Sequence, residues 1–179
     1  MSTPPVALDT DTAQHSPAQR SAYRIACGPW ILAFELHWTT GISDSFVLNP
    51  IPRAPAWLAG CTNVEGLVIP VVDLSLLLDP QAPTQTTAAT EKTRLLLGGY
   101  SGADNEEAIG VLFTGLPQYI TYTPEALPDE IPLPAPVKAL ARGFARANAG
   151  PPALEVDADA LIDLCIRQLD AAEALLPHA

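Results

Sequence analysis

Short apolar runs bounded by Gly, Pro, Asn and Asp dominate the chain, which is the pattern of a mostly β protein. Residues 22–26 and 30–35 flank the turn-forming triplet 27–29 and predict a hairpin. The other predicted strands are 46–48, 61–63, 67–74, 94–98, 109–113, 118–122 and 153–156. Because Pro70 has no N–H to donate, its strand must place it at an edge or a bulge. About ten short strands at this spacing indicate a sandwich or two small barrels.

Two segments show a helical pattern. A long C-terminal helix is predicted to start at Asp157 or Asp159, whose side chains can accept hydrogen bonds from free N–H groups. Its apolar face consists of Leu161, Leu164, Cys165, Leu169, Ala172, Leu175 and Leu176. Such a face usually packs on a core, and a partner surface is the less common alternative.

Residues 135–148 allow two interpretations. Lys138, Arg142 and Arg146 recur every four residues and would form one basic stripe on a helix. Gly143 and the 149–152 segment instead suggest a strand, a turn and a second strand. We favour a short helix near 136–141 followed by a hairpin.

The chain divides into a tail, one domain and a helix end. Residues 1–20 contain three prolines and no aromatic residue, so we expect a disordered N-terminal tail. Residues 79–93, rich in Thr, Ala and Pro, predict a long surface loop inside the domain. The folded domain is expected to span 21–170, with 171–179 as the end of the last helix.

Composition narrows the classes of partner. The 179 residues include 48% hydrophobic side chains, enough for a packed core, and 20 acidic against 9 basic residues give a net charge of -11. That charge repels phosphate, so we expect no nucleic-acid partner and no binding to anionic lipid. Residues 1–14 lack a secretory signal pattern and 66–78 are too short to span a bilayer. We therefore expect a cytoplasmic protein without direct membrane insertion.

Reactive groups do not converge in any known catalytic pattern. Among three histidines, His37 is the sole candidate for a general base, because the other two lie near the chain ends. The three cysteines form no C-x-x-C pair, and the glycine-rich 98–102 segment is not followed by G-K-[ST]. Asp157, Asp159 and Asp163 lack the glycine and glutamate of a calcium loop. We expect no catalytic residues, no cofactor, no metal and no small-molecule substrate; an enzyme using His37 or a cysteine is the remaining alternative.

Residues 49–79, NPIPRAPAWLAGCTNVEGLVIPVVDLSLLLD, resemble the central signature of the CheW-like domain family. That signature has the form I-P-x-A-P-x-x-[LIV]-x-G followed by x-x-N-x-x-G-x-[LIV]-[LIV]-P-[LIV]-[LIV]-D-L. The matching residues are Pro52, Pro55, Leu58, Gly60, Asn63, Gly66, Pro70, Asp73 and Leu74. The resemblance continues more weakly at 109–113, 124–127, 141–144 and 159–162, and so covers about residues 20–170.

The resemblance implies a fold and a role. CheW-like domains are two small five-stranded β-barrels around a common hydrophobic core, and they are not enzymes. Members are adaptors that couple methyl-accepting chemoreceptors to a CheA-type histidine kinase in signalling arrays. The implied partners are the cytoplasmic tip of a chemoreceptor, in a groove between the barrels, and the kinase, against a barrel end. The chain would then be recruited to membrane-associated receptor arrays.

Two positions depart from the family pattern. The N-x-x-G turn of many adaptors reads N-L-R-G, whereas this chain has Glu65 in place of the arginine. The strand that usually carries a receptor-facing aliphatic pair and a glutamate is represented by Leu36, Thr39 and Gly41. The alternative is therefore a diverged binding module for another two-component or type IV pilus (twitching motility) partner. The protein-binding residues that the resemblance implies are Leu36, Thr39, Gly41, Val64, Glu65, Gly66 and Val111.

Overall fold

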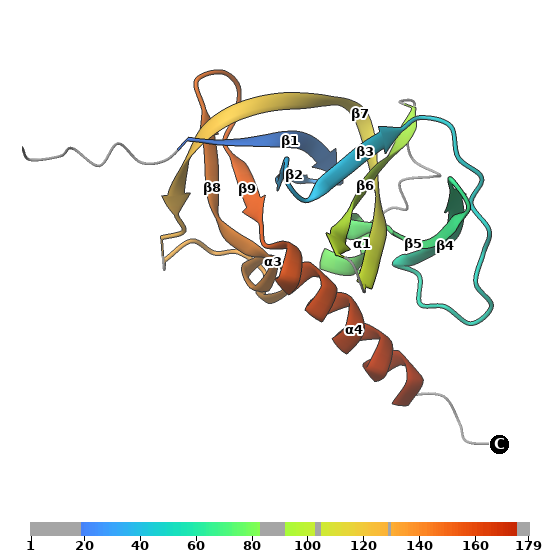
Figure 1. The fold of residues 1–179 in the computed structure, drawn as a ribbon. Helices are drawn as coiled ribbons and strands as arrows, with labels where there is room; N and C mark the ends of the chain where they lie inside the picture. Colours follow the sequence, from blue (N-terminus) through green and yellow to red (C-terminus); the bar gives the residue numbers. More distant parts are fainter. Residues whose placement is uncertain (1–18, 83–91, 103–104, 129, 175–179) are drawn as a thin grey trace, which may run out of the picture.

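The computed structural model describes residues 19–82, 92–102, 105–128 and 130–174, and confirms a mostly β fold with a C-terminal helix (Figure 1). Nine strands form one hydrogen-bonded sheet. In chain order the elements are β1 (Arg20–Cys27), β2 (Trp30–Glu35), β3 (Thr39–Ser43), β4 (Leu58–Val64), β5 (Leu67–Val72), α1 (Leu74–Leu78), β6 (Thr93–Gly102), β7 (Asn105–Ala126), α3 (Ala135–Leu140), β8 (Ala141–Ala147), β9 (Ala153–Val156) and α4 (Ala158–Ala174).

The first half of the fold is a closed ring of five strands. The antiparallel β1–β2 hairpin is continued by parallel β2–β9, then by antiparallel β9–β8 and β8–β7. The antiparallel pairing of β7 with β1 closes the ring. Each of the five strands contributes to the small core inside it, which consists of Ala22, Ala33, Ile120, Tyr122, Ala145 and Ala153. Because four of these six residues are alanine, the strands can curve around a narrow interior.

The second half is a row of five strands in the order β3–β6–β7–β5–β4. β7 belongs to both halves: its first part pairs with β6 and its last part with β1 and β8. The predicted strands 109–113 and 118–122 are therefore one continuous strand, in which Gly115 has φ 77°. This sharing explains why two five-stranded units need only nine strands.

One predicted strand is wrong. Residues 46–48 form no strand, and only the next residue, Asn49, makes an isolated bridge to Cys61 of β4. Phe46 and Leu48 instead pack against the core of the second half, which is formed by Val71, Leu95 and Leu112. Phe46 and Leu48 thus pack on the interior of the second half without joining the sheet, whereas Val47 between them is 73% exposed.

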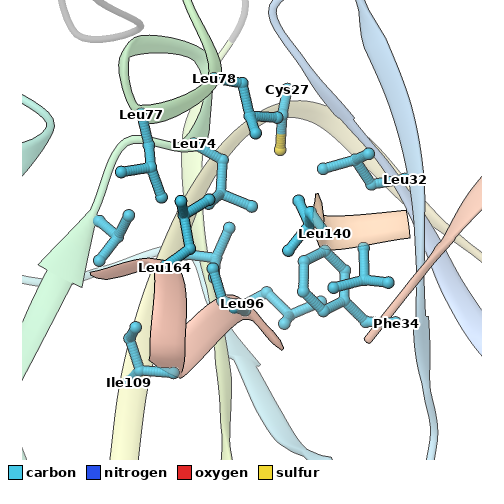
Figure 2. Close-up of a cluster of buried hydrophobic side chains, with 14 of the residues drawn as sticks. Cys27, Leu32, Phe34, Leu74, Leu77, Leu78, Leu96, Ile109, Leu140 and Leu164 are labelled. Atoms are coloured by element: carbon cyan, nitrogen blue, oxygen red, sulfur yellow. The ribbon is translucent and has the colours of Figure 1, made fainter. Parts of the chain in front are cut away.

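The main core lies between the two halves and beneath the helices. Figure 2 shows side chains from β1, β2, β6 and β7 meeting those of α1, α3 and α4. Its fully buried members include Cys27, Leu32, Phe34, Trp38, Leu74, Leu96, Val111, Phe113, Val137, Leu140 and Leu161. The two halves are therefore held together by a common hydrophobic core, as the family resemblance implies.

The helix α1 was not predicted. The expected strand 67–74 ends at Val72, and Asp73 then caps a five-residue helix whose residues are all buried. The Asp73 Oδ1 atom accepts hydrogen bonds from the backbone N–H groups of Ser75 (3.0 Å) and Leu76 (3.4 Å). Four of the five helix residues are leucine and all five are buried, so this short segment shows no helical period that could separate it from the preceding strand.

The predicted short helix, hairpin and last helix are confirmed. Of the described residues on the predicted apolar face of the last helix, only Leu161, Leu164 and Cys165 pack on the core, because Leu169 is 40% exposed. The short helix α3 precedes the β8–β9 hairpin, and Asp157 Oδ1 accepts a hydrogen bond from Ala160 N (3.1 Å) at the start of α4. The tail prediction is one residue or more too long, because Arg20 already belongs to β1. Residues 1–18, 83–91, Leu175 and Leu176 lie outside the described residues. No helix in the described part of the chain is long and apolar enough to cross a membrane.

Candidate protein-binding surfaces

The β4–β5 hairpin presents Glu65 at its tip. Val64 pairs with Leu67, and the two residues between them have φ values of 51° (Glu65) and 92° (Gly66). Two successive positive φ values define the type I′ turn, the two-residue turn that fits the twist of a hairpin. Asn63 Oδ1 accepts a hydrogen bond from Gly66 N at 3.1 Å and fixes the turn further. The backbone at Glu65 is therefore fixed by the turn, and its side chain is exposed.

An apolar surface adjoins this tip on β5. Leu67 and Val68 are exposed by 40% and 66%, while Ile69 and Val71 point into the protein. The β5–β7 pairing involves Val71 and Val72, so at Pro70 the strand has β4 as its only neighbour among the described residues. This edge position is the one that Pro70 was predicted to need. Exposed Leu67 and Val68 offer a partner apolar area next to Glu65.

A second surface surrounds Leu36 in the β2–β3 connection. A groove is lined there by Arg20, Ser21, Glu35, Leu36, His37 and Arg142. The backbone is fixed by a hydrogen bond from Leu36 N to Ser21 O (2.9 Å), and Thr39 Oγ1 donates to Glu35 O (3.2 Å). Leu36 itself is 39% exposed. The groove thus combines an accessible leucine with charged side chains on an anchored backbone.

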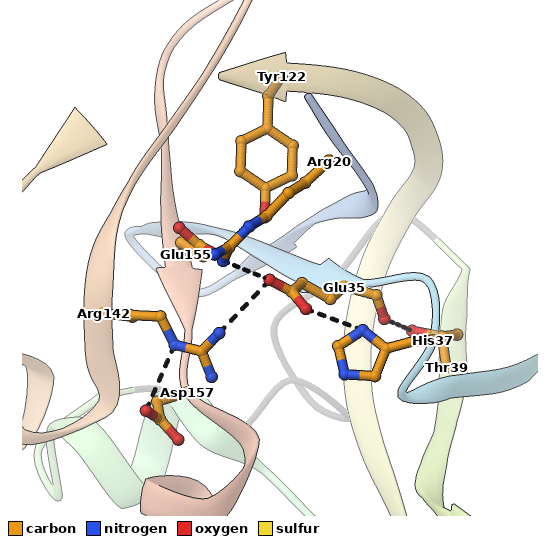
Figure 3. A network of polar contacts seen from close by, with 8 residues as sticks. All are labelled: Arg20, Glu35, His37, Thr39, Tyr122, Arg142, Glu155 and Asp157. Carbon is orange, nitrogen blue, oxygen red and sulfur yellow. Dashed lines mark hydrogen bonds and ion pairs between the residues drawn. The ribbon is translucent and has the colours of Figure 1, made fainter. Parts of the chain in front are cut away.

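Charged residues from four segments meet beside this groove (Figure 3). Glu35 Oε1 accepts from Arg20 Nη1 (2.7 Å) and Arg142 Nη1 (3.4 Å), and Glu35 Oε2 lies 2.8 Å from His37 Nδ1. Arg20 Nη1 also contacts the Oε1 atom of Glu155 on β9 at 2.5 Å. Glu35, at the end of β2, therefore links this strand to β1 through Arg20 and to β8 through Arg142.

The network continues into the first barrel through Glu155. Tyr122 Oη donates a hydrogen bond to Glu155 Oε1 at 3.0 Å, and both side chains are buried. Burial and the nearby charge of Glu155 raise the pKa of the Tyr122 hydroxyl well above its usual value. Tyr122 is thus kept protonated and able to donate to the buried carboxylate.

The pKa of Glu35 is lowered. Partial burial alone would raise it, but interaction with the Glu155 carboxyl and with the charges of Arg20, His37 and Arg142 outweighs burial. Glu35 is therefore ionised at neutral pH and holds the surrounding cations in place.

The residues that the resemblance implied fall into two groups. Leu36, Thr39 and Gly41 lie around the start of β3, one edge of the second strand row, while Val64, Glu65 and Gly66 lie at the tip beside β4, the other edge. A side chain at Gly41 would find space, since a β-carbon there would meet only Leu97 Cδ1 at 3.7 Å. Val111 needs correction: it is fully buried in the main core and offers no surface to a partner.

Sequence reasoning missed the charged groove and the exposed apolar residues of β5. Arg20 and Glu155 are 135 positions apart, and no local pattern indicates that they meet. Val68 could have been found, because Ile69 and Val71 alternate with exposed positions along β5. Lys138, Arg142 and Arg146 would have formed a basic stripe on a single helix. The structure places Lys138 on α3 and the exposed Arg142 and Arg146 on β8, so no such stripe forms.

The described residues include few candidates for metal binding or nucleophilic chemistry. They contain no group of three or more His, Cys, Asp or Glu side chains able to hold a metal. Burial raises the pKa of the Cys27 thiol, with a further contribution from Asp73, and raises that of Cys165 to about 11. These thiols are therefore weak nucleophiles, and His37 faces Glu35 at the groove.

Comparisons with known proteins agree with this architecture. The model of the CheW-like domain family matches residues 31–165. Solved structures with a similar fold include the scaffolding protein TtCheW from Thermoanaerobacter tengcongensis, with a TM-score of 0.63 and 14% sequence identity over 78% of this chain and 90% of that chain. A search of curated proteins finds no match to the sequence. Since the family model covers well over half of the residues, the chain belongs to the CheW-like domain family.

Proposed function

We propose that this protein is a non-catalytic chemosensory scaffold that couples chemoreceptors to a CheA-type histidine kinase. Its membership in the CheW-like family supports a scaffolding role. The observation that carries the proposal is the hairpin tip, where a type I′ turn fixes Glu65 beside exposed Leu67 and Val68. A rigid apolar patch with a charged residue at its rim suits a protein interface, because little conformational entropy is lost on binding.

A scaffold needs two separate surfaces, and the chain offers two. The Leu36 groove and the hairpin tip lie at opposite edges of the β3–β6–β7–β5–β4 row. We assign the groove to the tip helix of a receptor and the hairpin to the kinase. Both partners could then bind one molecule at once, in the cytoplasm beneath a membrane-associated receptor array.

A second candidate function is favoured by Glu65. Many adaptors that this chain resembles carry an arginine at this position of the turn, so their kinase or receptor partner would meet a charge of the opposite sign here. Like charges facing one another across an interface cost affinity and exclude partners. The alternative is thus a module for a different two-component or type IV pilus signalling partner, one with a basic residue opposite Glu65.

The test measures binding of the full-length chain to purified candidates from the same organism. These are the cytoplasmic fragments of its chemoreceptors and its CheA-type kinases, including any encoded with pilus components. Wild type is compared with Glu65→Arg and with Glu130→Arg, which makes the same charge change at an exposed position away from the hairpin. We expect Glu65→Arg to change kinase affinity by about tenfold, since an interfacial charge is reversed.

Each outcome decides between the candidates. Binding of wild type to both a receptor and a kinase, with an effect of Glu65→Arg but not Glu130→Arg, supports the scaffold. Binding only to a pilus-linked or other two-component partner supports the alternative. Absence of binding to every candidate, with the chain folded, overturns both.

A further inference from the structure

The groove beside Leu36 presents two arginines of a protein that has few basic residues. The chain has only nine Lys and Arg residues against twenty Asp and Glu. Two of the nine, Arg20 and Arg142, line this groove together with His37. Figure 3 shows that these side chains come from β1, β8 and the β2–β3 connection and converge around Glu35.

The two arginines and His37 are more accessible than the two glutamates of the network. The side chains of Arg20, Arg142 and His37 are 39%, 41% and 65% exposed, whereas those of Glu35 and Glu155 are 12% and 2% exposed. Both oxygens of Glu35 already have partners within the network: Oε1 contacts Arg20, and Oε2 contacts His37 Nδ1. A molecule entering the groove therefore meets N–H donors before it meets Glu35 and Glu155. Asp157, which is 32% exposed beside Arg142, is the accessible carboxylate of the network.

Arg142 is the donor best placed to bind something further. Its two contacts, Nη1 to Glu35 Oε1 and Nε to Asp157 Oδ2, are both long at 3.4 Å. Its Nη2 atom has no hydrogen-bond partner among the described residues. Arg20, in contrast, is held by Glu155 at 2.5 Å and by Glu35 at 2.7 Å. A guanidinium has five N–H donors in a planar fork that matches a carboxylate.

We propose that this groove binds a carboxylate side chain, Glu or Asp, of the receptor tip helix, with Arg142 as its main contact. An apolar residue beside that carboxylate on the helix would pack on exposed Leu36. The inference rests on the proposed function, because it names the chemistry of the receptor at this surface. The overall charge of -11 disfavours an acidic segment elsewhere on the protein, and the groove is a place where positive charge is accessible.

The test uses the full-length chain and the cytoplasmic fragment of the cognate receptor, with affinity measured by calorimetry. The variants are Arg142→Gln, Arg142→Lys and the matched control Arg146→Gln. Arg146 lies on the same strand, is 60% exposed and pairs with Glu125 at 2.7 Å, outside the groove. We expect Arg142→Gln to lower affinity about tenfold, Arg142→Lys about threefold or less, and Arg146→Gln to have no effect.

Two further readouts separate recognition from folding. Wild-type affinity should fall more steeply than that of Arg142→Gln as salt rises from about 0.05 to about 0.5 M. Salt screens the charge pair between Arg142 and the receptor carboxylate, and the variant cannot form this pair. A scan of the receptor's acidic residues to Gln should find one whose effect is not additive with Arg142→Gln. Thermal melts of all variants show whether each is folded.

The outcomes distinguish this inference from the proposed function. If wild type binds the receptor and Arg142→Gln binds as well as Arg146→Gln, the carboxylate site is wrong while the scaffold function stands. The same conclusion follows if no receptor acid is coupled to Arg142. If wild type does not bind the receptor at all, the receptor-coupling function fails and this inference fails with it.

Discussion

The indole ring of Trp38 lies directly against the Cα atom of Gly98, so that a β-carbon at this position would overlap three atoms of the ring. Trp38 is buried and stacks on Phe34 with ring centroids 5.3 Å apart. Gly99 N also donates to Trp38 O at 3.0 Å. This contact fixes the start of β3 against β6, and thus the Leu36 groove against the second half of the fold.

Gly98→Ala should therefore destabilise the protein strongly. A methyl group cannot fit beside a buried, stacked indole without moving it, so we expect a loss of about 3 kcal/mol in the free energy of unfolding. Urea denaturation followed by tryptophan fluorescence measures it. Gly41→Ala on the paired strand is the control, because its β-carbon would make only an ordinary contact, and it should change stability little. Equal stability of the two variants would show that Trp38 does not require glycine there.

Asp73 should be needed for the short helix α1. Its Oδ1 atom accepts from Ser75 N, Ser75 Oγ (2.5 Å) and Leu76 N in a fully buried setting. Asp73→Ala removes the cap and leaves buried donors unsatisfied, and we expect a loss of about 2 kcal/mol in unfolding free energy.

The matched control for Asp73 is Asp79→Ala. Asp79 also accepts from a backbone N–H group, that of Gln81, but at an exposed position where water can replace it. Thermal melts of both variants compare them directly. A similar decrease in Tm for the two would mean that burial of the cap contributes nothing.

Glu35 should make the protein sensitive to acid. Burial, which alone would raise its pKa, is outweighed by Glu155, Arg20, His37 and Arg142, so its pKa is lower folded than unfolded. A carboxyl with a depressed folded pKa stabilises the protein above its unfolded pKa of about 4.3, and this contribution is lost as the pH falls through the folded value.

The measurement is unfolding free energy against pH for wild type and Glu35→Gln. We expect wild type to be the more stable at pH 7 and the difference to shrink as the pH falls below the unfolded pKa of about 4.3 and through the lower folded pKa of Glu35. A difference that stays constant down to pH 2 would contradict a charge-based role. Glu125→Gln, which removes a carboxylate paired with a single exposed arginine, is the control and should change stability little.

The three cysteines should react in a fixed order. Cys61 is partly exposed, whereas Cys27 and Cys165 are buried and have raised pKa values, about 11 for Cys165. Because the thiolate is the nucleophile, iodoacetamide at pH 8 should modify Cys61 first in the native protein. Peptide mass spectrometry identifies the site. Early modification of Cys27 would show that the core around α1 opens readily.

Much of the fold could be predicted because many strands pair with a neighbour in the sequence and are bounded by residues typical of turns. The β1–β2 hairpin follows from its turn triplet, and the β8–β9 hairpin from the glycine and prolines at 149–152. Residues 46–48 were wrongly predicted as a strand because Phe46 and Leu48 are apolar. They are apolar because they pack on the core of the second half, and this packing does not require their backbone to pair with a strand. The helix α1 was not predicted because all five of its residues are buried, so apolar and polar positions do not recur along it with a helical period.

The candidate surfaces were predictable only in part. The N-x-x-G pattern indicates the tight turn at Glu65, because its geometry depends on four neighbouring residues. The groove depends on the pairing of β2 with β9, which brings Glu35 to Glu155 and Arg142 from distant parts of the chain. Sequence spacing carries no information on that pairing, so the charged groove emerges only from the fold.

The most direct test of the scaffold role is a bridging experiment. The receptor's cytoplasmic fragment is immobilised, the CheA-type kinase is added, and the kinase retained is measured with and without the full-length chain. We predict that the chain increases kinase retention and that Val68→Asp at the hairpin patch abolishes the increase while receptor binding persists. Kinase retention that is the same with and without the folded wild-type chain would contradict the account.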